Sequence, residues 1–203
     1  MQVTLIDANT HAMQSMVDAI GICRNKKCSL DTIEKALDAK PVPHLSVLEF
    51  GWAMVLVEGL SMKARVQADR HRIFGQFHSP IERSTRSIDM SLEDVVIPET
   101  VKDKEQFFID LSETMIKYHN ALNRGEAEED AAYQLPLAIT TKFYLAGNIR
   151  TWYEYFQKRL CKKHVQDEHY RLAVQMWELL QTEFPILRKA HPCKNCGKCQ
   201  EEK

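Results

Sequence analysis

The sequence lacks the features that mark exported and membrane-spanning proteins. It has no apolar run near the roughly 18 to 20 residues that a membrane-spanning helix needs. Its first residues, MQVTLIDANTHAM, do not place an apolar segment after a basic one, as a signal peptide does. We therefore expect a cytoplasmic protein that has no membrane partner.

An excess of charge of either sign is also missing. The chain has 27 lysine and arginine residues against 28 aspartate and glutamate residues, a formal net charge of −1. Proteins dedicated to nucleic acid usually carry a clear basic excess. The balance argues against a nucleic-acid partner, although it leaves room for a local basic patch.

Internal repeats and low-complexity segments are absent until the C-terminal tail. Of the 203 residues, 44% are hydrophobic and 27% charged, which is ordinary for a globular protein. We expect one domain over residues 1–188, followed by a cysteine-rich tail over residues 189–203.

The apolar pattern predicts a mixed α/β (α+β) fold with helix in excess. Strands are expected at 3–6, 50–57 and 140–146. Helices are expected from Asn9 or Thr10 to about 22, from Ser29, and over 60–72, 102–123, 148–159 and 165–188, with a short acidic helix between 126 and 136. One face of the 102–123 helix is apolar, through Phe107, Phe108, Leu111, Met115, Tyr118 and Leu122. Between 73 and 94 lies a loop of about twenty residues, a length typical of functional or mobile loops.

Two neighbouring segments concentrate groups that bind phosphate. Arg70, His71 and Arg72 are consecutive, and the run ERSTR follows at 82–86. A guanidinium group offers a planar fork for phosphate or carboxylate, and a histidine can donate, accept or stack. The segments suit a phosphorylated ligand held beside a heterocycle. Taken alone, they also fit a solvated basic helix end followed by a polar loop.

The order of several such elements resembles the signature of the flavin-dependent thymidylate synthases. In that family a Gln precedes an Arg-His-Arg run, and Glu-x-Ser-x-Arg follows it. The matching elements here are His44-x-Ser46-x-x-Glu49, Gln67-x-x-Arg70-His71-Arg72, Glu82-x-Ser84-x-Arg86, Leu135-Pro136, Asn148-x-Arg150 with Arg159, and Val165-Gln166-x-Glu168. Together they span most of residues 1–188.

The resemblance implies a fold with a central sheet flanked by long helices, and it implies two sets of binding residues. FAD would be held by Ser46, Arg70, His71, Arg72, Glu82, Asn148, Arg150 and Glu154. A pyrimidine nucleotide would lie against Gln67, Arg70, Glu82, Ser84, Arg86 and Arg159. Ser84 would be a nucleotide contact rather than a nucleophile, since no His–Asp arrangement is readable around it. His44 is as readily a turn or cap residue.

The reaction that the resemblance implies is reductive methylation of dUMP to dTMP. Methylenetetrahydrofolate would give the carbon, NADPH would reduce the FAD, and the reduced flavin would supply hydride. Arg159 would be the catalytic residue, stabilising negative charge on the pyrimidine ring as C5 becomes nucleophilic. Members of the family are homotetramers whose active sites are shared between subunits.

The chain also departs from the family pattern. Its loop between Arg72 and Glu82 is about four residues longer, and Ser87 stands where a Tyr follows the last Arg. Ala132 replaces an arginine that contacts the nucleotide phosphate, and one extra residue separates Arg159 from Gln166. Either another cation, such as Arg83 or Lys142, binds the phosphate in its place, or the substrate has changed.

These departures keep other functions open. The chain could act on another pyrimidine nucleotide, for example by hydroxymethylation, or it could be a flavin-binding or nucleotide-binding homologue that has lost catalysis. A further alternative is a small metal-dependent interaction module that uses the tail.

The six cysteines indicate reduced thiols or metal ligands rather than a disulfide framework. Cys193, Cys196 and Cys199 have the spacing of zinc or iron–sulfur ligands, and His191 is a possible fourth. A flexible tail without metal fits the same residues. Cys161 is expected in the core.

Overall fold

A three-stranded antiparallel sheet forms the centre of the protein, in the order β1 (Gln2–Ala8), β2 (Trp52–Ser61), β3 (Thr140–Asn148). The structure is a computed structural model that describes residues 1–39, 43–70, 84 and 90–191. All three predicted strands are present. β2 begins two residues later than expected, because Leu45–Phe50 forms the 3₁₀ helix η1 and buries Val47 and Leu48 there.

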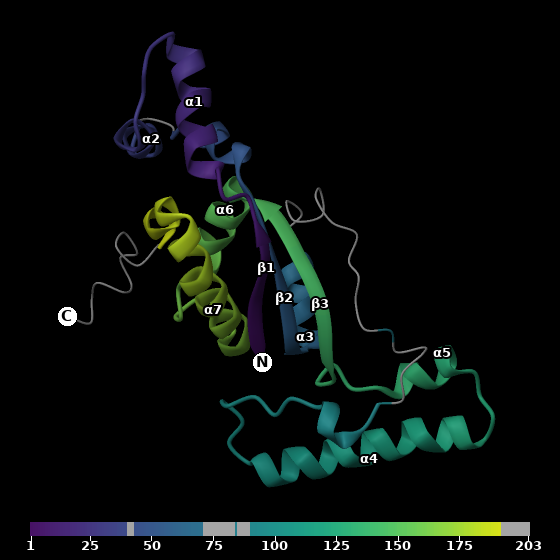
Figure 1. Cartoon of the computed structure of the whole chain (residues 1–203). Helices are drawn as coiled ribbons and strands as arrows, with labels where there is room; N and C mark the ends of the chain where they lie inside the picture. The colour runs from purple at the N-terminus through teal and green to yellow at the C-terminus, as the bar shows by residue number, and fades with distance from the viewer. Residues whose placement is uncertain (40–42, 71–83, 85–89, 192–203) are drawn as a thin grey trace.

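One face of the sheet is covered and the other is open. Ala53, Val55 and Val57 alternate along β2 and are fully buried, since they pack against the core formed with α6 (Ile149–Arg159) and α7 (Asp167–Glu183). Figure 1 shows these two helices beside the sheet. Trp52 and Tyr144, on the opposite face, are exposed. The mixed fold expected from the sequence is confirmed.

The other helices lie mainly beyond the two ends of the sheet. At one end are α1 (Ala12–Arg24) and α2 (Leu30–Leu37), and at the other are α4 (Lys104–Asn123) and α5 (Glu128–Ala131) (Figure 1). Directly after β2 comes α3 (Met62–Asp69), which contacts β2, β3 and α7. Short 3₁₀ helices complete the described chain: η3 (Leu92–Asp94), η4 (Ala132–Gln134) and η5 (Pro185–Ala190).

At two helix ends the structure differs from the sequence expectations, and at a third it agrees. The helix expected to end near residue 188 stops at Glu183, because Pro185 has no N–H to donate and restricts Phe184 before it. α1 begins after His11 rather than after Asn9 or Thr10; the Asn9 side chain instead accepts a hydrogen bond from the His11 N–H at 3.0 Å. Ser29 caps α2 as predicted, in a capping box with Thr32.

A small second core lies under α4. Met115, Tyr118 and Ala121 on this helix pack with Met90, Ala131 and Ile139. The predicted apolar face of α4 is therefore largely the buried one. Phe108 is the exception, because its side chain is 41% exposed and lies outside this cluster.

Gly51, between η1 and β2, occupies a position with no room for a side chain. A Cβ there would lie 2.7 Å from the Ala12 Cβ and 2.9 Å from both Ile149 Cγ1 and Met16 Cε. We expect Gly51→Ala to lower the free energy of unfolding by about 1 to 3 kcal/mol, because Ala12 has no rotamer by which to yield. Urea denaturation measures this, and an unchanged midpoint would show that the α1–η1 contact relaxes freely.

The described residues test one of the cysteine predictions. Cys161 is buried, as expected, whereas Cys23 is exposed and Cys28 half-buried. Cys193, Cys196 and Cys199 lie outside the described residues, so the metal alternatives and the separate tail stay predictions. Among the residues that are described, no cluster of three or more metal-ligating side chains is found. No helix within the described ranges is long and apolar enough to cross a bilayer.

Candidate active site

One face of α3 lines a cavity of about 240 Å³. The helix begins at Ser61, whose hydroxyl accepts a hydrogen bond from the Ala64 N–H at 3.1 Å. From there Lys63, Gln67 and Arg70 follow at intervals of four and three residues, which places them on the same side of the helix. All three line the cavity, together with Val66.

The remaining residues that line this cavity come from distant parts of the chain. Arg159, the last residue of α6, lines it together with Leu137. The fold therefore brings together three of the six predicted nucleotide contacts, Gln67, Arg70 and Arg159. Ser84 is half-buried and is not among the described residues that line the cavity. Glu82 and Arg86 lie outside the described residues.

The charged residues described in the lining of this cavity are all cationic. Lys63, Arg70 and Arg159 are cationic, and no carboxylate stands among the described residues that line the walls. Gln67 adds an amide, while Val66 and Leu137 are apolar. Three cations beside an apolar wall suit an anionic group attached to a less polar ring.

The Gln67 side chain contacts a buried histidine, which in turn contacts a buried tyrosine. His169 is fully buried, with its Nδ1 3.3 Å from Gln67 Oε1 and its Nε2 2.9 Å from the Tyr155 hydroxyl. Burial raises the pKa of Tyr155, an effect that the nearby Arg159 charge partly opposes. A protonated Tyr155 that donates to Nε2 leaves the histidine proton on Nδ1, facing the Gln67 oxygen. The Gln67 NH₂ group is then available to donate hydrogen bonds to a ligand.

Two further motif residues make hydrogen bonds at the N-terminal ends of α7 and α3. The Gln166 side chain caps α7 by accepting from the His169 N–H at 3.1 Å. Glu168, which is 3% exposed, accepts from the Ser61 N–H at 2.8 Å and from the Ser61 hydroxyl at 2.6 Å. The start of α7 is thus tied to the start of α3, which carries the cavity-lining face.

Three of the predicted flavin residues, Asn148, Arg150 and Glu154, lie at the N-cap or in the first part of α6, whereas Arg70 lines the α3 cavity and Ser46 lies in η1. Asn148 caps α6, its Oδ1 accepting from the Thr151 N–H and hydroxyl, both at 2.9 Å. Arg150 donates to Glu154 Oε1 at 2.9 Å and to Glu49 Oε1 at 2.6 Å. Hydrogen bonds to Glu154 and then to Glu49 raise the pKa of Arg150. A ligand phosphate would compete with these two carboxylates for Arg150.

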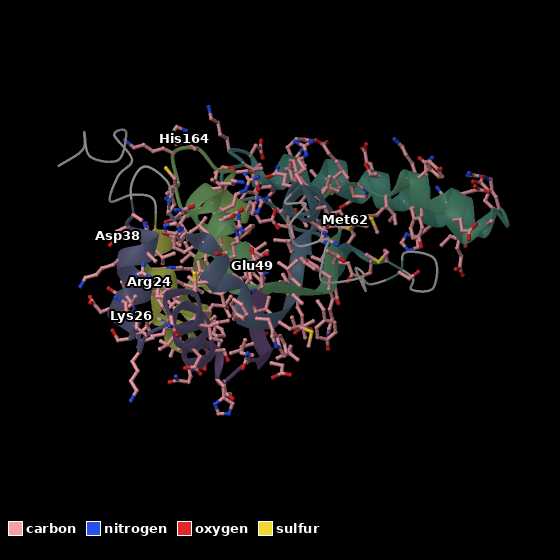
Figure 2. All side chains as sticks on the ribbon, turned by 90° about the horizontal axis from the view of Figure 1, so that it is seen from above. Arg24, Lys26, Asp38, Glu49, Met62 and His164 are labelled. Atoms are coloured by element: carbon pink, nitrogen blue, oxygen red, sulfur yellow. The ribbon has the colours of Figure 1, made fainter. Side chains whose placement is uncertain are left out.

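A second cavity, of about 490 Å³, lies between η1 and the helices α1 and α2. Its polar lining includes His44, Ser46, Glu49 and Arg24, and Phe50 adds an aromatic wall. Figure 2 labels Arg24 and Glu49 on the side of α1, and Met62, the neighbour of Lys63, toward α4. Polar groups beside an apolar wall fit part of a flavin dinucleotide. His71, Arg72 and Glu82, also predicted to bind FAD, lie outside the described residues.

Comparison with known proteins decides the family. The family model described as "Thymidylate synthase complementing protein" matches residues 4–186. The chain belongs to this family. The resemblance drawn from the sequence motifs is confirmed.

Curated relatives of this chain carry the name flavin-dependent thymidylate synthase. The Pyrococcus furiosus enzyme is 27% identical over 198 residues, covering 89% of this chain and 78% of the relative. The Thermococcus onnurineus enzyme is 30% identical over 174 residues, covering 78% of this chain and 68% of the relative. The family is one of enzymes, as predicted.

Solved structures share the fold. Thymidylate synthase X from Helicobacter pylori, crystallised with FAD and dUMP, matches with a TM-score of 0.76 at 18% identity, over 94% of this chain and 99% of that one. A UMP/dUMP methylase from Streptomyces cacaoi, bound with 5-Br dUMP, matches with a TM-score of 0.71 at 19% identity, over 93% of each chain.

The structure of this family member also shows residues at the site that motif reasoning missed. Lys63 belongs to none of the matched elements, yet helical spacing from Gln67 and Arg70 would have placed it on their face. His169 and Tyr155 stand behind Gln67 through contacts that join residues 102 and 14 positions apart. No local sequence pattern predicts such contacts.

Proposed function

We propose that the chain is a flavin-dependent thymidylate synthase that transfers one carbon to C5 of dUMP and yields dTMP. The observation that carries the proposal is the meeting of Gln67, Arg70 and Arg159, from α3 and α6, around one cationic cavity. These three residues were predicted to contact the nucleotide from motifs far apart in the sequence. A nucleotide monophosphate combines the anion and the ring that such a cavity accepts.

Each of these residues has a distinct task in the proposed reaction. Arg70 binds and orients the nucleotide, and Gln67 donates its amide hydrogens to an acceptor on it. Arg159 stabilises the negative charge that develops on the pyrimidine ring when C5 becomes nucleophilic. Bound FAD, once reduced, supplies the hydride for the reductive step. No nucleophilic side chain of the protein takes part.

The proposal extends to the cofactor and to the assembly. FAD would be held by Ser46, Asn148, Arg150 and Glu154, together with Arg70, His71, Arg72 and Glu82. NADPH would reduce the flavin and methylenetetrahydrofolate would provide the carbon. The enzyme would act in the cytoplasm. As the resemblance implies, it would be a homotetramer with active sites shared between subunits, in which Ser84 and Arg86 also reach the nucleotide.

A related reaction is the second candidate. Ala132 replaces the arginine that contacts the nucleotide phosphate in the family, and Ser87 stands where the family has a Tyr. One-carbon transfer to another pyrimidine nucleotide, including hydroxymethylation, is compatible with the same cationic cavity.

Flavin retention and product analysis test the proposal together. Protein incubated with FAD and desalted is expected to keep a two-peaked flavin spectrum. With dUMP, methylenetetrahydrofolate and NADPH it should then produce a compound with the mass of dTMP, and reactions without the folate should produce none. A product formed only from dCMP or UMP would favour the second candidate. If FAD washes off and no product forms, the enzymatic proposal is wrong.

A further inference from the structure

Lys63 places a positive charge at the cavity lined by α3, Leu137 and Arg159, which the proposed function assigns to the nucleotide and which we call the nucleotide cavity. It is the second residue of α3, its side chain is exposed, and it lines the cavity with Arg70 and Arg159. Within the described part of the chain, Lys63 has no ion-pair or hydrogen-bond partner for its ammonium group. A lysine in this position gains most from an anionic ligand.

The backbone connects Lys63 to the segment in which alanine replaces the expected phosphate-binding arginine. Ala132 begins η4, and the chain continues through Leu135 and Pro136 to Leu137. The Leu137 carbonyl accepts a hydrogen bond from the Lys63 N–H at 2.9 Å, and both residues line the cavity. The lysine therefore stands where this segment reaches the cavity.

Lys142, one of the two cations suggested as a replacement, is engaged elsewhere. Its Nζ lies 2.6 Å from Glu58 Oε1, across the β2–β3 pair. Glu58 and Lys142 follow the alternation of Trp52 and Tyr144, which are on the open face of the sheet. α3 packs on the covered face, where the Arg65 guanidinium lies over the Phe143 ring. The other suggested cation, Arg83, lies outside the described residues.

We propose that Lys63 binds the phosphate of the pyrimidine nucleotide and supplies the positive charge that Ala132 does not provide. The inference rests on the proposed function for the identity of the ligand, and on the cavity for its charge. Lys63 acts with Arg70 as a phosphate clamp at the α3 wall. Arg159, which lines the same cavity from the end of α6, is left to act on the pyrimidine ring.

The contribution of Lys63 to phosphate binding is measured by comparing two ligands, with and without the phosphate, in proteins with and without the lysine charge. The FAD-loaded protein is titrated with dUMP and with deoxyuridine by calorimetry. Lys63→Met should weaken dUMP binding about tenfold and leave deoxyuridine binding unchanged, since a charge-assisted bond acts on the phosphate alone. Lys63→Arg should restore dUMP affinity to within about threefold of the wild type. Lys142→Met, which removes an equal charge on the open face, should change neither affinity.

The outcomes separate this inference from the enzymatic proposal. If Lys63→Met weakens both ligands equally, or neither, Lys63 is not a phosphate ligand, even when the wild type makes dTMP. If the wild type makes no dTMP but binds another pyrimidine monophosphate in preference to its nucleoside, and Lys63→Met removes that preference, the assigned reaction fails and the phosphate-binding role of Lys63 stands. A wild type that prefers no nucleotide over its nucleoside would overturn both.

Discussion

Arg159→Ala is expected to abolish thymidylate synthesis, with a loss of at least about 100-fold in kcat, while the protein retains FAD. Arg159 ends α6 and lines, with Gln67 and Arg70, the cavity that we assign to the nucleotide. Removing one preorganised group that stabilises developing charge typically costs about 10²- to 10³-fold in rate. The cavity that includes Arg159 is separate in lining from the one that includes Ser46. Flavin binding should therefore survive the substitution.

Turnover with dUMP and the flavin spectrum after desalting measure the two effects on the same sample. Arg159→Lys keeps a positive charge without the planar fork, and we expect it to recover only part of the rate. Lys142→Met serves as the control for removal of a surface charge and should retain full activity. Normal turnover by Arg159→Ala would remove Arg159 from the mechanism. Loss of flavin together with turnover would instead assign it a structural or cofactor-binding role.

The fold was predictable where a periodic pattern ran without interruption. The apolar stripe of α4, the apolar run of β2 and the alternation in β3 led to elements that the structure contains. Boundaries were missed where one residue overrides a pattern. Pro185 ends α7 early, and the predicted strand at 50–57 begins at Trp52 because Phe50 belongs to η1, which buries Val47 and Leu48 in a helical turn. Periodicity alone does not distinguish a short apolar strand from an apolar turn.

The site was predictable from motif order to a more limited extent. Gln67, Arg70 and Arg159 came from separate motifs, and the cavity joins them. Their supports were not predictable, since His169 and Glu168 reach Gln67 and Ser61 over 102 and 107 positions of sequence. Such pairs are set by how α7 packs on α3, which no local spacing encodes. Of the predicted flavin residues, His71, Arg72 and Glu82 lie outside the described residues.

Glu168→Ala is expected to lower the free energy of unfolding by about 3 kcal/mol. The Glu168 carboxylate is buried and accepts both the Ser61 N–H and the Ser61 hydroxyl. Hydrogen bonds to charged groups are worth about 1.5 to 3 kcal/mol each, and the substitution leaves the buried Ser61 N–H without its acceptor. For a chain of this size the melting temperature should fall by roughly 6 to 12 °C.

Matched variants separate the Ser61 contact from a general effect of shortening a side chain on α7. Glu178 is exposed on the same helix, so Glu178→Ala should change the free energy of unfolding by less than about 0.5 kcal/mol. Glu168→Gln keeps a carbonyl oxygen for the Ser61 N–H and should cost less than alanine. Because Ser61 caps α3, the Glu168→Ala variant should also bind dUMP more weakly, through displacement of Gln67 and Arg70. If Glu168→Ala has the same melting temperature as the wild type, the Glu168–Ser61 contact between α7 and α3 does not hold the nucleotide cavity in place.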